Sequence, residues 1–218
     1  MLLNLDAGER DDETVELYRL FDLLNVACGG HAGDLETMAR VVAASSARIG
    51  AHPSYPDVEH FGRHSLAIAP SDLQESITIQ CAQLRAIARH VGHVKPHGAL
   101  YHDAAQSLEL AEAVLVGARS ALGSFTVIGP PTGALRDAAA ALGLPYLREG
   151  FADRRMRADG SLVPRSEPDA LITDPAAAAA QAVALAGRVD TICIHADTPG
   201  ALAIARAVRE ALGSPIDG

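Results

Sequence analysis

The feature that most constrains the fold is the alternation, along the whole chain, of short β-type runs with longer helical patterns. This alternation is typical of parallel strands joined by crossover helices. No linker or internal repeat interrupts it, so we expect one domain over residues 1–218. The predicted strands lie at residues 2–6, 23–28, 48–52, 93–97, 125–129, 145–152 and 191–196.

Within the predicted strands, apolar and polar residues alternate. In the first run, Leu5 points to one face and Asn4 and Asp6 to the other, because successive side chains of a strand point to opposite faces. An open doubly wound sheet is covered by helices on both faces, and its strands are near-continuous apolar runs. A single closed layer, apolar toward outer helices and polar toward its interior, explains the alternation. We therefore expect an α/β fold, a TIM-like (β/α) barrel of about seven units.

Helix starts are marked by capping residues. Ser71 and Gln74 form a capping box, and Asp34 is placed to cap the helix after the second strand. Asp174-Pro175 and Thr198-Pro199 each put a capping residue before a proline. These positions predict helices beginning at residues 72, 35, 175 and 199.

The composition of the chain limits the classes of partner that it is expected to bind. The net charge is −9, and phosphate binding depends on clustered lysine and arginine, so neither nucleic acid nor an anionic membrane is expected as a partner. No apolar run approaches the ~18 residues that cross a bilayer. The N-terminus has no basic segment ahead of an apolar one, which predicts a cytoplasmic protein without a signal peptide. Small molecules, other proteins and further copies of the chain (a homo-oligomer) remain as partners.

The three cysteines predict thiols rather than bridges. Cys28, Cys81 and Cys193 are odd in number, far apart and without a C-x-x-C pair. This pattern fits reduced, buried thiols better than a disulfide framework or a structural zinc site.

Histidines end four of the predicted strands. His31, His52, His97 and His195 fall there together with Asp6, at the end of a barrel where active sites are found. A lone histidine at such a place is usually structural, but repetition over four units predicts a site. The cluster could ligate a divalent metal that activates water, or it could supply metal-free general acids and bases to an amide. The metal ligands, if an ion binds, would come from Asp6, His52, His97 and His195.

Lys95 is the only lysine of the chain and lies between His93 and His97. Three roles are open to it: a Schiff-base nucleophile, an anchor for an anion, or a structural ion pair with Asp6 or Glu149. The first role needs a buried lysine with a depressed pKa. We expect the catalytic residues to be Asp6, His31, His52, Lys95, His97 and His195.

The stretch from Glu149 to residue 166 combines carboxylates with arginines. If Glu149 and Asp153 share a face, two carboxylates reach the barrel interior, and Arg154 and Arg165 could hold an anion bidentately. The alternative is a charged hairpin, since Asp159-Gly160 is a common turn pair. The candidate substrate-binding residues are Asn25, Tyr101, Glu149, Asp153, Arg154 and Arg165.

The sequence lacks a nucleotide site. A G-x-x-x-x-G-K-[ST] motif is impossible when the only lysine is Lys95, and no G-x-G-x-x-G follows a strand. If the reaction uses ATP, another chain must bind it.

Six motifs, taken in order, resemble those of the LamB/YcsF family and span almost the whole chain. They are Asn4-Leu-Asp-Ala-Gly-Glu9, Asn25-Val-Ala-Cys-Gly-Gly-His-Ala-Gly-Asp34, Ile49-Gly-Ala-His-Pro-Ser-Tyr-Pro-Asp57 with Phe61-Gly-Arg63, His93-Val-Lys-Pro-His-Gly-Ala-Leu-Tyr101, Phe151-Ala-Asp-Arg154 through Leu162-Val-Pro-Arg165, and Asp190-Thr-Ile-Cys-Ile-His-Ala-Asp197.

The resemblance implies a distorted β/α barrel similar to glycoside hydrolases and polysaccharide deacetylases. It also implies an ATP-dependent 5-oxoprolinase that opens 5-oxoproline, a small anionic lactam, to glutamate together with partner B and C subunits, on which ATP would be bound. The matching motif positions are Asp6, His31, His52, Lys95, His97, Asp153, Arg154 and His195. Two alternatives are a metal-dependent hydrolase or deacetylase acting on a sugar or amide without ATP, and a non-catalytic substrate-binding subunit.

The chain departs from the family pattern in a few places. Gly30 stands where the resemblance leads us to expect Phe, Ser54 where it leads us to expect Gly, and Ala7 where it leads us to expect Leu. These departures bear on substrate identity and partner docking more than on the fold.

Overall fold

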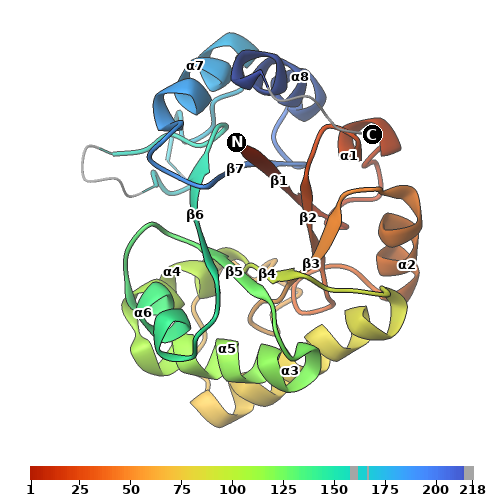
Figure 1. The fold of residues 1–218 in the computed structure, drawn as a ribbon, viewed down its shortest axis with the longest axis vertical. Coiled ribbons are helices and arrows are strands. Elements are labelled where there is room, and N and C mark those ends of the chain that lie inside the picture. The colour runs from red at the N-terminus through yellow and green to blue at the C-terminus, as the bar shows by residue number, and fades with distance from the viewer. Residues whose placement is uncertain (158–161, 166, 214–218) are drawn as a thin grey trace.

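Seven parallel strands close into a barrel in sequence order (Figure 1). The computed structural model describes residues 1–157, 162–165 and 167–213. Pairing of the first strand with both the second and the last closes the ring. The strands are β1 Leu2–Ala7, β2 Leu23–Ala27, β3 Arg48–His52, β4 His93–Val94, β5 Thr126–Gly129, β6 Tyr146–Phe151 and β7 Thr191–His195. The predicted TIM-like barrel is therefore confirmed.

Helices surround the ring of strands (Figure 1). At least one helix follows each strand, and two helices follow β4. None of the described helices is both long and apolar enough to cross a bilayer. The helices are α1 Val15–Tyr18, α2 Leu35–Ala44, α3 Pro70–Ile87, α4 Gly98–Gln106, α5 Leu108–Leu122, α6 Ala134–Ala141, α7 Pro175–Leu185 and α8 Ala201–Leu212.

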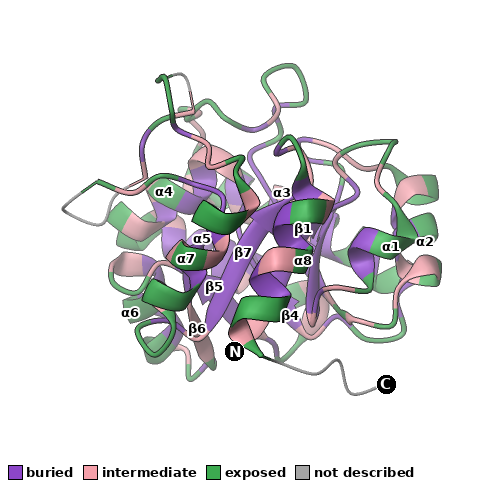
Figure 2. Ribbon diagram, turned by 90° about the horizontal axis from the view of Figure 1, so that it is seen from above, coloured by how far each residue is buried: buried purple, intermediate pink, exposed green. Residues whose placement is uncertain are grey.

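The two faces of the strands are sorted as the alternation predicted. Leu3 and Leu5 are fully buried in the main apolar cluster, with residues from the surrounding helices. The polar faces meet inside the barrel, where Asn25 Nδ2 donates to Asn4 Oδ1 (2.8 Å) and Asn4 Nδ2 donates to Thr191 Oγ1 (3.0 Å). The strands are accordingly buried on both sides (Figure 2).

Two predicted helix starts are wrong and two are right. Asp34 and Asp174 cap α2 and α7 by accepting from Thr37 N and Ala177 N. The α3 helix instead begins at Pro70, whose fixed φ suits the first helical position, so Ser71 and Gln74 form no capping box. The α8 helix begins after Gly200, because the hydroxyl of Thr198 is used elsewhere, as described below.

The three cysteines are buried free thiols, as predicted. Burial raises the pKa of Cys28 to about 12, so this side chain stays protonated at neutral pH.

A glycine in β3 makes room for a histidine of the neighbouring strand. His93 Nε2 lies 2.9 Å from Asn25 Oδ1 inside the barrel. A Cβ at Gly50 would lie 2.1 Å from the His93 ring. This level of the interior therefore accepts no larger residue at position 50 without displacing His93.

We predict that Gly50→Ala lowers the free energy of unfolding by about 1–3 kcal/mol, because overpacking forces the ring out of place. Urea unfolding of both proteins measures the difference. Gly92→Ala is the matched control, since the nearest atom to its Cβ would be in the ring of exposed His90, at 3.1 Å, and the backbone oxygen of Ile49 would be at an ordinary 3.9 Å. Equal losses in the two variants would contradict the packing argument.

Candidate active site at the carboxyl ends of the strands

The predicted site residues converge at the carboxyl ends of the strands. All of them except Arg165 are buried, and His97 and His195 keep exposed fractions of only 7% and 9%. The barrel therefore holds its ionisable groups largely away from water, where electrostatic interactions are strong.

A cavity of about 480 Å³ lies at the opposite end of the strands, lined by residues that include Leu23, Arg48 and Gly92. Among the described residues, none of the groups of potential metal ligands lies in its lining. We therefore place the chemistry at the carboxyl ends, as in other β/α barrels.

Lys95 is at the centre of the buried charges. Its ammonium nitrogen lies 2.9 and 3.1 Å from the two oxygens of Asp6, and 3.1 Å from Cys193 Sγ. It also lies 2.9 Å from Glu149 Oε1, although neither Glu149 oxygen accepts a hydrogen bond at normal geometry among the described residues. Lys95 thus lies close to both of the carboxylates considered from the sequence, Asp6 and Glu149, at the same time.

The carboxylates keep Lys95 charged. Burial alone would lower the pKa of Lys95, but Asp6, Cys193 and Glu149 raise it well above its usual value. Burial alone would likewise raise the pKa of Asp6, while His52 and Lys95 lower it well below its usual value. The depressed pKa that a Schiff-base nucleophile needs is therefore not provided, and Lys95 acts as a cation.

We predict that Lys95→Met destabilises the protein by about 3–5 kcal/mol at pH 7, because it leaves two buried carboxylates without a cation. The double variant Lys95→Met, Glu149→Gln should be more stable than the sum of the single losses by about 0.5–3 kcal/mol. Urea unfolding of the wild type, both single variants and the double variant completes the cycle. Additive losses would show that Glu149 and Lys95 are not coupled.

Asp153 orients His195. The Asp153 oxygens lie 3.0 and 3.1 Å from His195 Nδ1, and Asp153 Oδ2 also accepts from His195 N and from the Thr198 hydroxyl. Because a carboxylate can only accept, Nδ1 carries the proton and Nε2 of a neutral His195 presents a lone pair. That nitrogen lies 3.7 Å from Asp6 Oδ2. The geometry is that of a histidine base held by a carboxylate.

Asp153 itself stays ionised. Burial would raise its pKa, but His195 and the Thr198 hydroxyl lower the pKa below the ordinary value. A lowered folded-state pKa stabilises the protein above the unfolded-state value of about 3.9, and this contribution is lost as the pH falls toward the folded-state value.

We predict that Asp153→Asn is less stable than the wild type by about 1–3 kcal/mol at pH 7, and that the difference shrinks as the pH falls below about 4. Urea unfolding at a series of pH values measures it. Asp11→Asn, which removes an exposed carboxylate, is the control and should follow the wild type at every pH. A difference independent of pH would mean that the charge of Asp153 is not involved.

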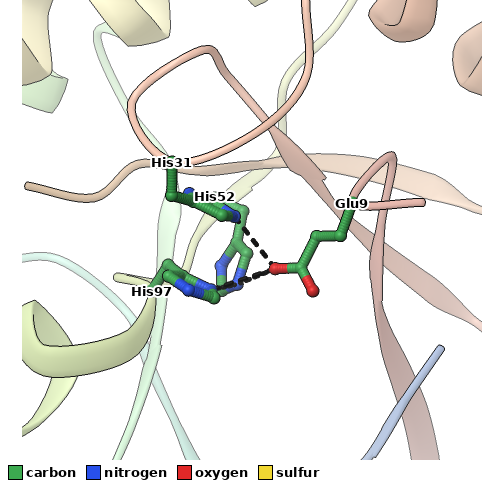
Figure 3. Close-up of side chains that lie close together, drawn as sticks. All are labelled: Glu9, His31, His52 and His97. Atoms are coloured by element: carbon green, nitrogen blue, oxygen red, sulfur yellow. Dashed lines mark hydrogen bonds and ion pairs between the residues drawn. The ribbon is translucent and has the colours of Figure 1, made fainter. Parts of the chain in front are cut away.

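A second group of ionisable side chains surrounds one oxygen of Glu9 (Figure 3). Glu9 Oε1 lies 2.9 Å from His31 Nε2, 3.0 Å from His97 Nδ1 and 3.5 Å from His52 Nε2. We call Glu9, His31, His52 and His97 the Glu9 cluster. Burial lowers the pKa of His31 to about 3, so this imidazole is neutral.

The metal set predicted from the sequence is divided between two groups. His52 and His97 belong to the Glu9 cluster, whereas Asp6 and His195 lie together with Cys193. Asp6 is engaged by Lys95, so a cation already occupies that second group. The predicted combination of Asp6, His52, His97 and His195 is therefore not brought to one point.

Arginines gather at the loops over the barrel. Arg63 and Arg165 both lie 2.7 Å from Asp197 Oδ2. Arg154 donates to the carbonyl of Val163, while its buried Nε has no partner among the described residues. Burial, followed by the repulsion of Arg165, lowers the pKa of Arg154 to about 10. Asp197 and Asp153 together carry fewer charges than the three arginines, which leaves positive charge for an anion.

The remaining candidate substrate-binding residues are Asn25 and Tyr101. Asn25 Nδ2 donates to both Asn4 and Asp6, which places Asn25 beneath Asp6 as a support. The Tyr101 ring packs edge-on against Phe151, and burial together with the charge of Glu149 raises the pKa of its hydroxyl. The hairpin alternative for residues after Arg154 is partly seen, because Met156 pairs antiparallel with Leu162; the turn pair Asp159-Gly160 lies outside the described residues.

The sequence did not predict Glu9 or Thr198 as site residues. It also did not predict that Arg63 and Arg165 share Asp197. Glu9 had a signal, since it follows Gly8 directly after the first strand, and Gly8 has a φ of +76° that turns the chain back toward the barrel. Thr198 was taken for a helix cap, and nothing local distinguishes that role from a bond to Asp153.

Two departures from the family pattern prove to be in contact. A Cβ at Gly30 would lie 2.4 Å from both Ser54 Oγ and Gln80 Oε1. Gln80 fills this space by accepting from Ser54 N (3.0 Å) and donating to Ser54 O (2.9 Å). The small residue at 30 and the larger one at 54 therefore compensate each other.

Comparisons with known proteins identify the family and agree with the fold. The chain is 41% identical to the 5-oxoprolinase A subunit of Methylococcus capsulatus over 240 aligned positions, which cover 97% of this chain and 92% of that protein. It is 39% identical to the 5-oxoprolinase A subunit of Limosilactobacillus fermentum, over 95% of this chain and 93% of that protein. The crystal structure of the lactam utilization protein from Thermus thermophilus superposes with a TM-score of 0.89 at 32% identity, covering 98% of this chain and 96% of that one. The LamB/YcsF family profile matches residues 3–215, and the chain belongs to this family.

Proposed function

We propose that the chain is the A subunit of a cytoplasmic ATP-dependent 5-oxoprolinase, in which it opens the lactam of 5-oxo-L-proline to give L-glutamate while partner B and C subunits bind ATP. The observation that carries the proposal is the pairing of a base, His195, with the buried cation Lys95 across Asp6. The names of the relatives support the substrate, and the absence of a nucleotide motif supports the division of labour.

The arginines supply the anchor in this proposal. The carboxylate of 5-oxoproline would bind Arg154, whose buried Nε lacks a partner among the described residues, with Arg165 beside it. Bidentate binding of a carboxylate by arginine fixes orientation as well as position. The lactam carbonyl would then point into the barrel toward Lys95.

Lactam opening requires a water molecule to attack the carbonyl carbon, which the partner subunits would activate by phosphorylation. His195 Nε2 takes the proton of the water as the C–O bond forms, and the imidazolium is stabilised by Asp153. Lys95 stabilises the negative charge on the carbonyl or phosphoryl oxygen. When the C–N bond breaks, the ring nitrogen takes the proton back from His195, and the phosphoryl group stays on the new carboxyl group as an acyl phosphate. Hydrolysis of this acyl phosphate by a second water molecule releases inorganic phosphate and leaves L-glutamate. Asp6 is engaged by Lys95, so His195 is better placed than Asp6 to act as the base.

The test is glutamate release from 5-oxoproline and ATP, measured with this chain alone, with candidate B and C subunits alone, and with all three. Glutamate is expected only in the complete mixture. His195→Gln should lower the rate by about 100-fold or more, because general acid–base catalysis contributes about 10²–10⁴-fold. His90→Gln, at an exposed position near the far end of the barrel, is the control and should keep the wild-type rate.

Two results would contradict the proposal. Full activity of the B and C subunits without this chain would leave it no role in the reaction. A wild-type rate in His195→Gln would remove the assigned base and favour a non-catalytic, substrate-binding role.

A further inference from the structure

The Glu9 cluster joins the ends of four consecutive strands. Glu9 follows β1, His31 follows β2, His52 ends β3 and His97 follows β4. Their side chains are at most 8% exposed, and one potential ligand atom from each lies within 4.8 Å of the other three. The mechanism above uses none of these atoms, although His52 Nε2 lies 3.4 Å from Asp6 Oδ2.

Backbone carbonyls fix the state of two of the histidines. His52 Nδ1 lies 2.7 Å from the carbonyl oxygen of Lys95, and His97 Nε2 lies 2.9 Å from that of Phe61. A carbonyl oxygen can only accept, so both nitrogens carry hydrogen. In the neutral rings, His52 Nε2 and His97 Nδ1 therefore each carry a lone pair. These two nitrogen atoms lie 3.0 Å apart, beside Glu9 Oε1. Lone pairs arranged in this way need a cation between them.

The surroundings hold these atoms in place. The Glu13 carboxylate accepts from the backbone N–H groups of Gly8, Glu9 and Arg10, which fixes the turn that carries Glu9. Phe61 has a φ of +56°, uncommon for a residue with a side chain, and this conformation directs its carbonyl to His97. Hydrogen bonds from ligand histidines to carbonyls are the usual outer contacts of metal sites.

We propose that the Glu9 cluster binds one divalent transition-metal ion, with Zn²⁺ the best match, through Glu9 Oε1, His31 Nε2, His52 Nε2 and His97 Nδ1. Three imidazoles and a carboxylate are ligands that zinc accepts. Zn–N bonds of about 2.0–2.1 Å place tetrahedral ligand atoms about 3.3–3.4 Å apart. Four of the six separations among these atoms are 2.9–3.5 Å, close to that spacing. Asp6 adds negative charge beside the ion.

The competing occupant is a proton shared between His52 Nε2 and His97 Nδ1. In that state His31 Nε2, 2.9 Å from Glu9 Oε1, would donate to the carboxylate, whereas a metal would be bound by all four atoms. Binding of the ion follows from ligand geometry alone; a contribution to lactam opening would in addition rest on the proposed function.

The test is titration of the isolated chain, freed of metal by a chelator, with Zn²⁺ in a calorimeter, and with Co²⁺ followed by its visible absorption. The wild type is expected to bind one equivalent with a tetrahedral Co²⁺ spectrum. Glu9→Gln keeps the shape of the side chain but removes the charge, and it should weaken binding beyond the about 10–100-fold typical of losing an outer contact. Should Glu9→Gln fail to fold, as judged by circular dichroism, His31→Gln replaces it with the same expectation.

The control removes two exposed histidines that lie near a different carboxylate, Asp57. Asp57, His60 and His64 form a group of potential ligands in which the two histidines are exposed, with their ring centroids 4.3 Å apart. His60→Ala, His64→Ala should keep the single equivalent and its affinity. No stoichiometric binding by the wild type, unchanged affinity in Glu9→Gln, or loss of binding in the control would each overturn the proposal; the first result would assign the cluster to the shared proton.

The titration contains neither 5-oxoproline nor ATP, so its outcome is separate from that of the activity assay. One equivalent of metal without glutamate release would retain this inference and reject the proposed function. Glutamate release by a chain that binds no metal would do the reverse.

Discussion

The burial of Lys95 between two carboxylates is the interaction on which the rest of the site depends. A barrel interior must be filled by side chains, and here many of them are polar, so each donor must find an acceptor inside the barrel. Lys95 balances Asp6 and Glu149, Asn25 supports Asp6, and His93 completes that network from a place left open by Gly50. Buried charges are stable only when each has an opposite charge or hydrogen-bond partner. The interior is therefore held together by ion pairs as well as by packing.

The charges divide into two neighbouring regions with different properties. On one side, Lys95 and His195 combine a fixed cation with an oriented base. On the other, the Glu9 cluster gathers one carboxylate and three imidazoles. His52 belongs to the second region and also approaches Asp6 at 3.4 Å, so it joins the two. A change in the occupancy of the Glu9 cluster would therefore be felt at Asp6 and, through it, at Lys95.

Much of this arrangement could be predicted from the sequence, because a strand has a strict period of two. Polar residues at alternate positions predicted the closed barrel and the inward direction of Asp6, Lys95 and His195. The residues that were missed lie beyond the strand ends, where no period applies. Glu9 depends on the turn at Gly8, and Thr198 could have capped a helix or bonded Asp153. How the histidines group could not be predicted, since order along the chain does not give distances across a barrel.

Closure of the ring between β1 and β7 has a consequence for how the protein is made. The hydrogen bond from Asn4 to Thr191 joins residues 187 positions apart, so it cannot form before nearly the whole chain has been synthesised. Until β7 is in place, β1 and β6 keep unpaired edges, which are prone to pairing with other chains. Such distant contacts also slow folding. Loss of the last strand would thus leave an open, aggregation-prone sheet and not merely a less stable barrel.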